Sequence, residues 1–327
     1  MIITVTLNAA IDKTLEVPNF QLGRRHRSVE QRSLAGGKGV NVARAIKRLG
    51  QPVVATGFAG GPTGSRIVEQ LTEESVLNDF VHIHQESRMN TAVLDPTIRT
   101  DGSDSPGQVT EINEPGPEVS AQEAELFCDK LLYLAKGAQI CVFAGSLPRG
   151  LGPDLYARLV RDVARLGVTT VLDTDGEPLR HGVRAEPAVI SPNVLEAEAL
   201  VGHEFNDDED RVIAVREMVE LGAGEAIMTT PDGCFAQVLE EGGPRLYRVR
   251  VEPLEPRAAV GSGDAFLAGY VAARYAGRPP AECLRFAVAC GAESTQHLGA
   301  GLIEPRAAER LAAEIQLEAL ELPAEVG

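Results

Sequence analysis

Residues 258–270 read AAVGSGDAFLAGY, and they join a glycine turn, a carboxylate and an apolar run. Gly261 and Gly263 flank Ser262 and let backbone N–H groups converge. A helix that begins there would add the positive end of its dipole, and such a junction can hold a phosphate. Asp264 has two interpretations. It can be a first-turn acid that satisfies the free amides, or a base that accepts a proton from an attacking hydroxyl beside that phosphate.

Strands and helices alternate along the rest of the chain, which predicts a three-layer α/β sandwich around a mainly parallel sheet. No linker divides the sequence, so residues 1–327 are expected to form a single domain. Two β-rich segments, about 12–35 and 86–113, interrupt the alternation and predict a small β-lid beside the main sheet. The polar stretch 99–108 is expected to be the mobile tip of its hairpin, and the acidic tail after Pro305 to be a terminal helix with a frayed end.

The predicted strands are residues 2–7, 53–60, 80–85, 90–96, 138–145, 168–174, 187–191 and 225–230. The predicted helices are residues 37–50, 63–74, 153–167 and 207–222, and the chain is predicted to be mostly helical from residue 264 onward.

The composition excludes several classes of function. Lys and Arg number 31 against 47 Asp and Glu, a formal net charge of -16, which argues against nucleic-acid and anionic-membrane partners. The five cysteines are scattered without a CxxC pair, so neither a zinc site nor a disulfide framework is predicted. Neither a signal peptide nor an apolar run long enough to span a membrane is apparent, and a cytoplasmic protein is expected.

Two motifs in the first half of the chain can contact a small ligand. AGGKGVN (35–41) places Gly36, Gly37, Lys38 and Asn41 at the start of a predicted helix. It can meet sugar hydroxyls and a phosphate, or be an ordinary loop-to-helix junction. Asp12 follows the first strand, where acids often face the ligand crevice of a parallel sheet. The alternative for Asp12 is a solvated turn.

Two further residue pairs have both a functional and a plain interpretation. Asn193 and Glu196 lie three residues apart near a predicted helix start, where they can hold Mg²⁺ through water or form a helix cap. Arg88 and the nearby Asn90 can contact a substrate phosphate or belong to a solvated face.

The order of five motifs resembles that of the ribokinase-like, phosphofructokinase-B family of carbohydrate kinases. The motifs are TLNAAID (6–12), AGGKGVNVARA (35–45), AGSLPRG (144–150), SPNVLEAE (191–198) and VGSGDAFLAGY (260–270). Within the family the sequence is most similar to the branch of 1-phosphofructokinases and tagatose-6-phosphate kinases. The resemblance covers roughly residues 2–315. It implies an α/β sandwich with a β-lid and ATP-dependent phosphorylation of a sugar or sugar phosphate.

The resemblance also implies roles at matching positions. Asp264 would be the catalytic base, and the amides of Gly261, Ser262, Gly263 and Asp264 would hold the γ-phosphate. The implied substrate-binding residues are Asp12, Gly36, Gly37, Lys38, Asn41, Arg88 and Asn90. The implied nucleotide-side residues are Asn193, Thr229, Thr230, Asp232, Gly233 and Gly263, with Glu196 and Asn193 binding Mg²⁺ through water. ATP and Mg²⁺ are therefore the expected cofactors, and a homodimer through the lid is the implied assembly.

Three departures from the family pattern lie on the ATP side. Ser191 stands where a lysine is common, Thr230 replaces a glycine of the nucleotide turn, and Ala258-Ala259 replace a hydroxyl- or acid-containing pair. They leave the phosphoryl donor and any dependence on a monovalent ion open.

The leading hypothesis is a kinase that converts fructose 1-phosphate to fructose 1,6-bisphosphate. A 6-phosphofructokinase or tagatose-6-phosphate kinase is the same-family alternative. A non-catalytic sugar-phosphate sensor on the same fold is the alternative from another class, and the ATP-side departures motivate it. A dinucleotide-dependent oxidoreductase rests on glycine-rich turns alone.

Overall fold

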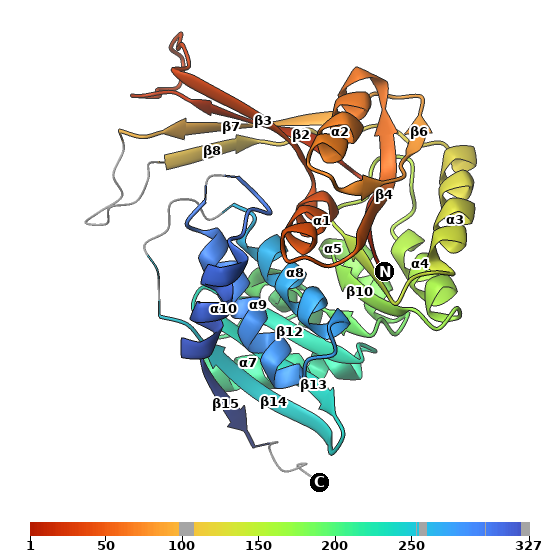
Figure 1. The fold of residues 1–327 in the computed structure, drawn as a ribbon, viewed down its shortest axis with the longest axis vertical. Coiled ribbons are helices and arrows are strands. Elements are labelled where there is room, and N and C mark those ends of the chain that lie inside the picture. The colour runs from red at the N-terminus through yellow and green to blue at the C-terminus, as the bar shows by residue number, and fades with distance from the viewer. Residues whose placement is uncertain (98–107, 253, 255–259, 298, 322–327) are drawn as a thin grey trace.

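A large mixed sheet forms the centre of the molecule (Figure 1). The computed structural model describes residues 1–97, 108–252, 254, 260–297 and 299–321. The strands of the large sheet are β1 (Ile2–Thr6), β4 (Val53–Gly60), β5 (Leu77–Asn78), β6 (Val81–Ile83), β9 (Ile140–Ala144), β10 (Thr169–Asp173), β11 (Val189–Ile190), β12 (Glu225–Thr230), β13 (Gly233–Glu240), β14 (Gly243–Arg250) and β15 (Gln316–Leu320). They are arranged in the order β15-β14-β13-β12-β11-β10-β9-β1-β4-β5, and β6 pairs with β4. Pairing is parallel from β12 to β5 and antiparallel from β12 to β15.

Helices cover both faces of this sheet. They are α1 (Lys38–Arg48), α2 (Gly61–Glu73), α3 (Ala121–Ala135), α4 (Leu155–Ala164), α5 (Gly176–Val183), α6 (Val194–Val201), α7 (Asp208–Glu220), α8 (Ser262–Tyr275), α9 (Pro280–Ser294) and α10 (Pro305–Glu314). Neighbouring strand residues face opposite cores because side chains alternate along a strand. Ile2 and Val142 pack in the core that contains α1, α8 and α9, whereas Ile3 and Phe143 pack in the core that contains α3, α4 and α7. This arrangement confirms the predicted three-layer α/β sandwich.

A second, smaller sheet lies beside the sandwich, at the top of the view in Figure 1. Its strands are β2 (Ala10–Glu16), β3 (Glu30–Gly36), β7 (Arg88–Asp95) and β8 (Gln108–Ile112), in the order β3-β2-β7-β8. These strands come from the two segments in which the β-lid was predicted. Residues 98–107 of the expected hairpin tip lie outside the described residues.

The end of the chain corrects one prediction. Helix α10 forms where a helix was expected after Pro305, but residues 316–320, which were expected to belong to the frayed end, form a strand, and residues 322–327 lie outside the described residues. Gln316–Leu320 form β15, which pairs antiparallel with β14 from Leu246 opposite Leu320 to Arg250 opposite Gln316. Strand β14 would otherwise present a row of unpaired backbone groups at the sheet edge. The free edge of β14 exists only once the sheet has assembled. Residues 316–320 therefore could not be predicted as a strand from their own sequence.

Among the helices of the described ranges, none is long and apolar enough to cross a membrane.

The packing of α3 generates a prediction about stability. Leu131 is fully buried between this helix and the sheet, whereas Leu126 on the same helix is 55% exposed. Leu131→Ala is expected to lower the free energy of unfolding by about 2–5 kcal/mol, because it leaves a cavity. Leu126→Ala is the matched control and is expected to change it by no more than about 0.5 kcal/mol. Urea denaturation measures both, and equal effects would contradict the assigned packing.

Candidate active site

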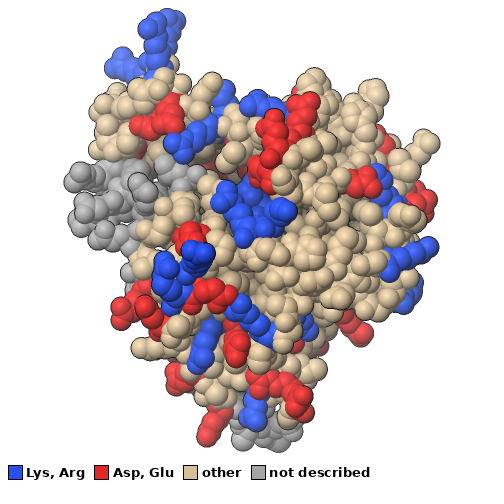
Figure 2. All heavy atoms as spheres, in the orientation of Figure 1, with Lys and Arg blue, Asp and Glu red and all other residues tan. Residues whose placement is uncertain are grey.

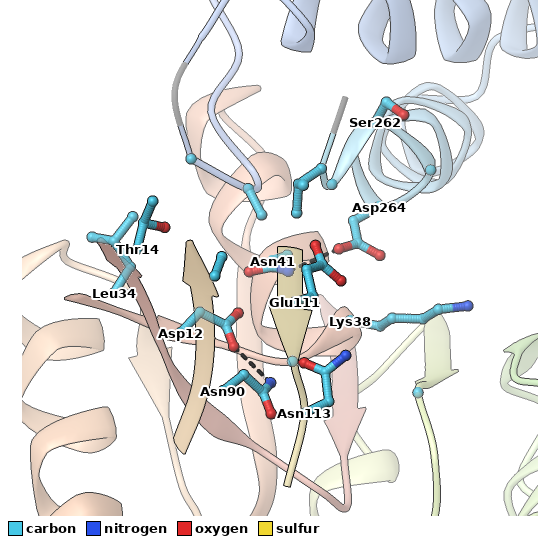
Figure 3. Close-up of a pocket in the computed structure, with 18 of the residues that line it drawn as sticks. Asp12, Thr14, Leu34, Lys38, Asn41, Asn90, Glu111, Asn113, Ser262 and Asp264 are labelled. Atoms are coloured by element: carbon cyan, nitrogen blue, oxygen red, sulfur yellow. Dashed lines mark hydrogen bonds between the residues drawn. The ribbon is translucent and has the colours of Figure 1, made fainter. Parts of the chain in front are cut away.

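A cavity of about 910 Å³ lies between the small sheet and the start of α8 (Figure 3). It brings together side chains and turns that are far apart in the sequence. The residues singled out by sequence that line it are Asp12, Gly37, Lys38, Asn41, Arg88, Asn90, Asn193, Glu196, Thr229, Gly261, Ser262, Gly263 and Asp264. Gly36, Thr230, Asp232 and Gly233 are not among its described lining residues.

The N-terminus of α8 forms one wall of this cavity. Gly261 precedes the helix with φ +84, a conformation that favours glycine, and a Cβ there would lie 2.5 Å from the Cβ of Ala300. Among the described residues no side chain caps the helix, and the first amides of a helix have no intrahelical acceptor. A Cβ at Gly263 would meet no described atom within 4 Å, so the described residues leave the space beside these amides open. The turn can therefore accept an anion, as its sequence suggested.

Asp264 lies in the first turn of α8 with its side chain buried. Its Oδ2 accepts a hydrogen bond of 2.8 Å from Nδ2 of Asn41 on α1. Burial and the neighbouring charge of Asp173 raise the pKa of Asp264 to about 7, although Asn41 and Lys38 act in the opposite direction. A carboxyl group with this pKa can accept a proton near neutral pH.

Lys38 extends from the start of α1 away from the small sheet (Figure 3). Its Nζ lies 3.0 Å from Asp173 and 3.4 Å from Glu196. Burial would lower the pKa of Lys38, but the two carboxylates outweigh it and raise the pKa. The ammonium group is therefore charged and lies at the end of the cavity that also holds Glu196.

Asn193 and Glu196 form a capping box at the start of α6. Asn193 accepts a hydrogen bond from the Glu196 amide, and Glu196 accepts one from the Asn193 amide, both 2.9 Å long. Burial raises the pKa of Glu196. Within the described ranges, no group of three or more His, Cys, Asp or Glu residues is arranged to hold a metal. The oxygen donors present suit a hydrated Mg²⁺, which retains several of its waters.

The small sheet supplies the opposite wall. Asn90 on β7 donates a hydrogen bond of 2.8 Å to Asp12 on β2. The Asp12 carboxylate packs where a side chain of Gly36 would be, since a Cβ at Gly36 would lie 1.9 Å from Oδ2 of Asp12. Glu111 and Asn113 also line this part of the cavity. The wall is rich in hydrogen-bonding groups that suit the hydroxyls of a sugar.

Arg88 is held at the base of β7 by two backbone carbonyls. Its Nε donates to the Asn8 carbonyl at 3.1 Å and its Nη1 to the Glu114 carbonyl at 3.0 Å. The other terminal nitrogen has no hydrogen-bond partner in the part of the chain described. Burial lowers the pKa of Arg88, with Asp12 and Glu114 acting against the shift. This cation lines the cavity and has a donor to offer an anion.

The predicted nucleotide turn connects β12 to β13, and Thr229 alone of its four singled-out residues is on the described cavity wall. Asp232 accepts hydrogen bonds from Thr230 at 2.8 Å and from Arg248 at 2.6 Å. Ser191, the first of the three departures, is buried and lines the cavity. Ala258 and Ala259 lie outside the described residues.

Sequence reasoning missed several lining residues, of which Asp173 is the clearest. It ends β10, so the strand-end argument that singled out Asp12 applied equally to it. Ser146 follows the end of β9 and accepts a hydrogen bond of 3.1 Å from Asn8, which follows β1. Glu111 carried no such signal, because β8 is a short strand that is exposed throughout.

The fold and the site together define a class of protein. The N-terminus of α8 has no side-chain cap and carries a buried carboxylate in its first turn, and a wall of hydrogen-bonding side chains lies across the cavity. This arrangement, at the ends of parallel strands, suits phosphoryl transfer. The family model for pfkB family carbohydrate kinases matches residues 5–307.

Curated relatives and solved structures agree with that match. The chain is 31% identical to a 1-phosphofructokinase of Borreliella burgdorferi over 97% of this chain and 98% of the relative. It is 33% identical to a tagatose-6-phosphate kinase of Staphylococcus epidermidis, over 82% of this chain and 84% of the relative. The structure of phosphofructokinase-2 from Escherichia coli in complex with substrates and products superposes with a TM-score of 0.87 at 26% identity, covering 96% of this chain and 98% of the other. The chain belongs to the pfkB family of carbohydrate kinases and is a phosphotransferase that acts on a sugar hydroxyl.

The pKa of Asp264 generates a prediction about stability and pH. The folded-state pKa of about 7 exceeds the ordinary value of 3.8, so the folded protein binds this proton more tightly than the unfolded chain does. Stability from this group is therefore present at low pH and lost as the pH rises toward 7. Asp264→Asn keeps an acceptor for Asn41 and removes the buried charge. Relative to the wild type it is expected to gain stability as the pH rises from 5 to 8, by about 2–3 kcal/mol.

Urea denaturation of both proteins at pH 5, 6, 7 and 8 tests this expectation. A stability difference that stays constant across the series would contradict the raised pKa.

Proposed function

We propose that this kinase transfers the γ-phosphoryl group of ATP to a hydroxyl of a phosphorylated ketohexose, with fructose 1-phosphate converted to fructose 1,6-bisphosphate as the favoured reaction. The observation that carries the proposal is the open N-terminus of α8, with Asp264 buried in its first turn beside Asn41. The relatives named 1-phosphofructokinase and tagatose-6-phosphate kinase support the substrate class. Fructose 6-phosphate and tagatose 6-phosphate are the same-family alternatives.

In the proposed mechanism, the sugar lies against the small sheet. Asp12 and Asn90 bind its hydroxyls, and their mutual hydrogen bond fixes the orientation of both side chains. Asp264 accepts the proton of the attacking hydroxyl, while the amides of Gly261 to Asp264 stabilise the charge on the phosphoryl group in transfer. Positioning and charge neutralisation supply most of the catalysis in reactions of this kind.

Lys38 was expected to bind the substrate, and its contacts favour the phosphoryl group in transfer over the sugar. The ammonium group lies between Asp173 and Glu196, on the side away from the small sheet. At this place the Lys38 ammonium group would neutralise negative charge on the transferred phosphoryl group, which the net negative charge of the protein would otherwise repel.

Kinases of this family use ATP with a divalent metal, and we propose Mg²⁺. Asn193 and Glu196 would hold it through water, since their oxygens fit a hydrated ion and no described cluster binds a metal directly. When bound, Mg²⁺ neutralises charge on the ATP phosphates. Thr229 and the turn that follows it would contact the nucleotide.

Arg88 is the proposed contact for the phosphate that the substrate already carries. It lies at the small-sheet end of the cavity, with one terminal nitrogen left unbonded by the described residues. Asn8 and Ser146, which hydrogen-bond beside it, are polar neighbours for the same group. A cation there favours a sugar phosphate over an unphosphorylated sugar.

We propose a homodimer through the small sheet from its exposed apolar side chains. The small sheet exposes Val109 and Ile112 on β8, as well as Val29 just before β3. A homodimer through this sheet would cover them. It stays a prediction, which sedimentation equilibrium tests.

The experiment that tests the function measures ADP release with Mg-ATP across fructose 1-phosphate, fructose 6-phosphate, tagatose 6-phosphate, fructose and ribose. Turnover of one phosphorylated ketohexose, at least about tenfold above the unphosphorylated sugars in kcat/KM, is expected. The absence of turnover with folded protein would favour the sugar-phosphate sensor. Calorimetric titration with ATP and Mg²⁺ then distinguishes two explanations for the absence of turnover. No ATP binding would indicate a sensor, whereas ATP binding would indicate a kinase that acts on another acceptor.

Asp264→Asn tests the role of the proposed base. The variant retains shape and the contact with Asn41 but cannot accept the proton. Its kcat is expected to fall about 10²-fold or more, with little change in the affinity for the sugar phosphate. Steady-state kinetics and calorimetric binding measure the two effects. Wild-type kcat in this variant would exclude Asp264 as the base.

A further inference from the structure

Arg44 is a buried cation on the wall of the candidate active-site cavity that no proposed step uses. It lies on α1, three residues after Asn41, and is only 3% exposed. Its Nη1 donates to Oδ1 of Asn41 at 3.1 Å and to the carbonyl of Ala300 at 3.2 Å. Its Nη2 donates to the carbonyl of Ala35 at 2.6 Å and to Glu74 at 3.1 Å, and its Nε also donates to Glu74. All five N–H donors of the guanidinium are thus used.

These contacts fix the polarity of the Asn41 amide. A guanidinium only donates, so the atom of Asn41 that faces Arg44 must be the carbonyl oxygen. The NH₂ group of Asn41 must then face Asp264, where it donates the 2.8 Å hydrogen bond. A donor at this place favours the ionised carboxylate, whereas a carbonyl oxygen would favour the protonated acid.

The same guanidinium joins three parts of the site. Ala35 belongs to β3 at the base of the small sheet, and Ala300 packs against Gly261 of the phosphate turn. Gln70 of α2 adds to the first connection, because its side chain accepts from the Ala35 amide and donates to the Ser33 carbonyl. Glu74, one turn further along the chain, holds Arg44 itself.

We propose that Arg44 is a positioning residue of the kinase, which orients the Asn41 amide so that Asp264 is held ready to accept a proton. The inference rests on the proposed role of Asp264 as the base. Through Ala35 and Ala300, Arg44 also keeps the small sheet and the phosphate turn at a fixed separation. It acts through these neighbours and does not itself contact the substrate.

A direct ligand contact by Arg44 is the competing explanation. Basic side chains gather near the centre of the face shown in Figure 2, and a hollow of about 500 Å³ is lined by Arg32, Arg44 and Arg48. Arg44 has no N–H donor left for a ligand in that hollow, because its partners already use all five. The geometry therefore favours positioning.

The other charges around Asp264 remain in place when Arg44 is changed. They are Lys38 on α1, Asp12 on β2 and Asp173 on β10, with Glu111 on β8 and Glu196 on α6 lining the same cavity. Glu74, the C-cap residue of α2, is the charged partner of Arg44. Arg44→Met also removes the positive charge of Arg44, so the effect of the Asn41 orientation is read from Arg44→Lys, which keeps that charge while changing the hydrogen bonds.

The test compares Arg44→Met, Arg44→Lys and the control Arg48→Met by kcat/KM as a function of pH. Arg48 is exposed, lies one turn further along α1 and loses the same charge. The acid limb of this profile is the fall in kcat/KM at low pH as Asp264 becomes protonated. In Arg44→Met this limb is expected to move to higher pH by about 0.5–1 unit, because the Asn41 amide is no longer forced to donate a hydrogen bond to the Asp264 carboxylate. The kcat at pH 7 is expected to fall about tenfold or more and to recover in part at pH 9, with a smaller change in KM for ATP. Arg44→Lys, which keeps a donor, is expected to lie between Arg44→Met and the wild type.

An acid limb in Arg44→Met at the same pH as in Arg48→Met would overturn the proposal. If Arg44→Met does not fold, Arg44→Lys and Glu74→Gln decide, and an unmoved limb in both would also overturn it. Asp264→Asn separates this result from failure of the proposed function. If that variant keeps the wild-type kcat, the base assignment is wrong; if it loses activity while the limb in Arg44→Met stays fixed, only the positioning role is wrong.

Discussion

The hydrogen bond between Asn41 and Asp264 is the interaction on which the site depends. It joins two helix starts that are 223 residues apart in the chain, and it lies inside the protein, where an unpaired carboxylate would be costly. The helix dipole and the free amides of α8 favour an anion at this place, while burial and Asp173 disfavour the charge on Asp264. The opposing effects leave the carboxyl group with a pKa near neutrality, which is the range in which a base is useful.

The two sheets contribute different groups around the Asp264 carboxylate. In the proposed mechanism, the large sheet would supply the helix starts and strand ends of the phosphoryl side, and the small sheet would supply Asp12 and Asn90 on the sugar side. The net charge of -16 repels anionic substrates at long range, so their capture depends on short-range contacts. The positive charge of Lys38 is already balanced by two carboxylates. ATP with a bound metal carries less negative charge than free ATP and therefore matches this end of the cavity better.

The three-layer fold and the small sheet were predictable because strand–helix alternation and motif order reflect local chemistry. The strand-end argument pointed to Asp12, which lies inside β2 of the small sheet and not at a strand end, and it would have found Asp173 had it been applied to every strand. Glu111 could not be found, since only the pairing of β7 with β8 brings it to the cavity. Arg44 was equally hidden: in sequence it is an ordinary helical arginine, and its five hydrogen bonds go to four residues in four separate segments. Strand β15 formed because β14 had a free edge, which is a property of the assembled sheet.

Asn193 and Glu196 show that a structural and a functional interpretation need not exclude each other. The capping box uses Oδ1 of Asn193 and Oε2 of Glu196, and Lys38 approaches Oε1 of Glu196 from the cavity. A carboxylate has about four acceptor positions, so these contacts fix its orientation without exhausting its capacity. The cap holds Glu196 on the cavity wall, where burial raises the pKa of this carboxyl group and the nearby Lys38 ammonium opposes the shift. In the proposed mechanism, the helix cap would therefore keep Glu196 in place to bind a hydrated metal.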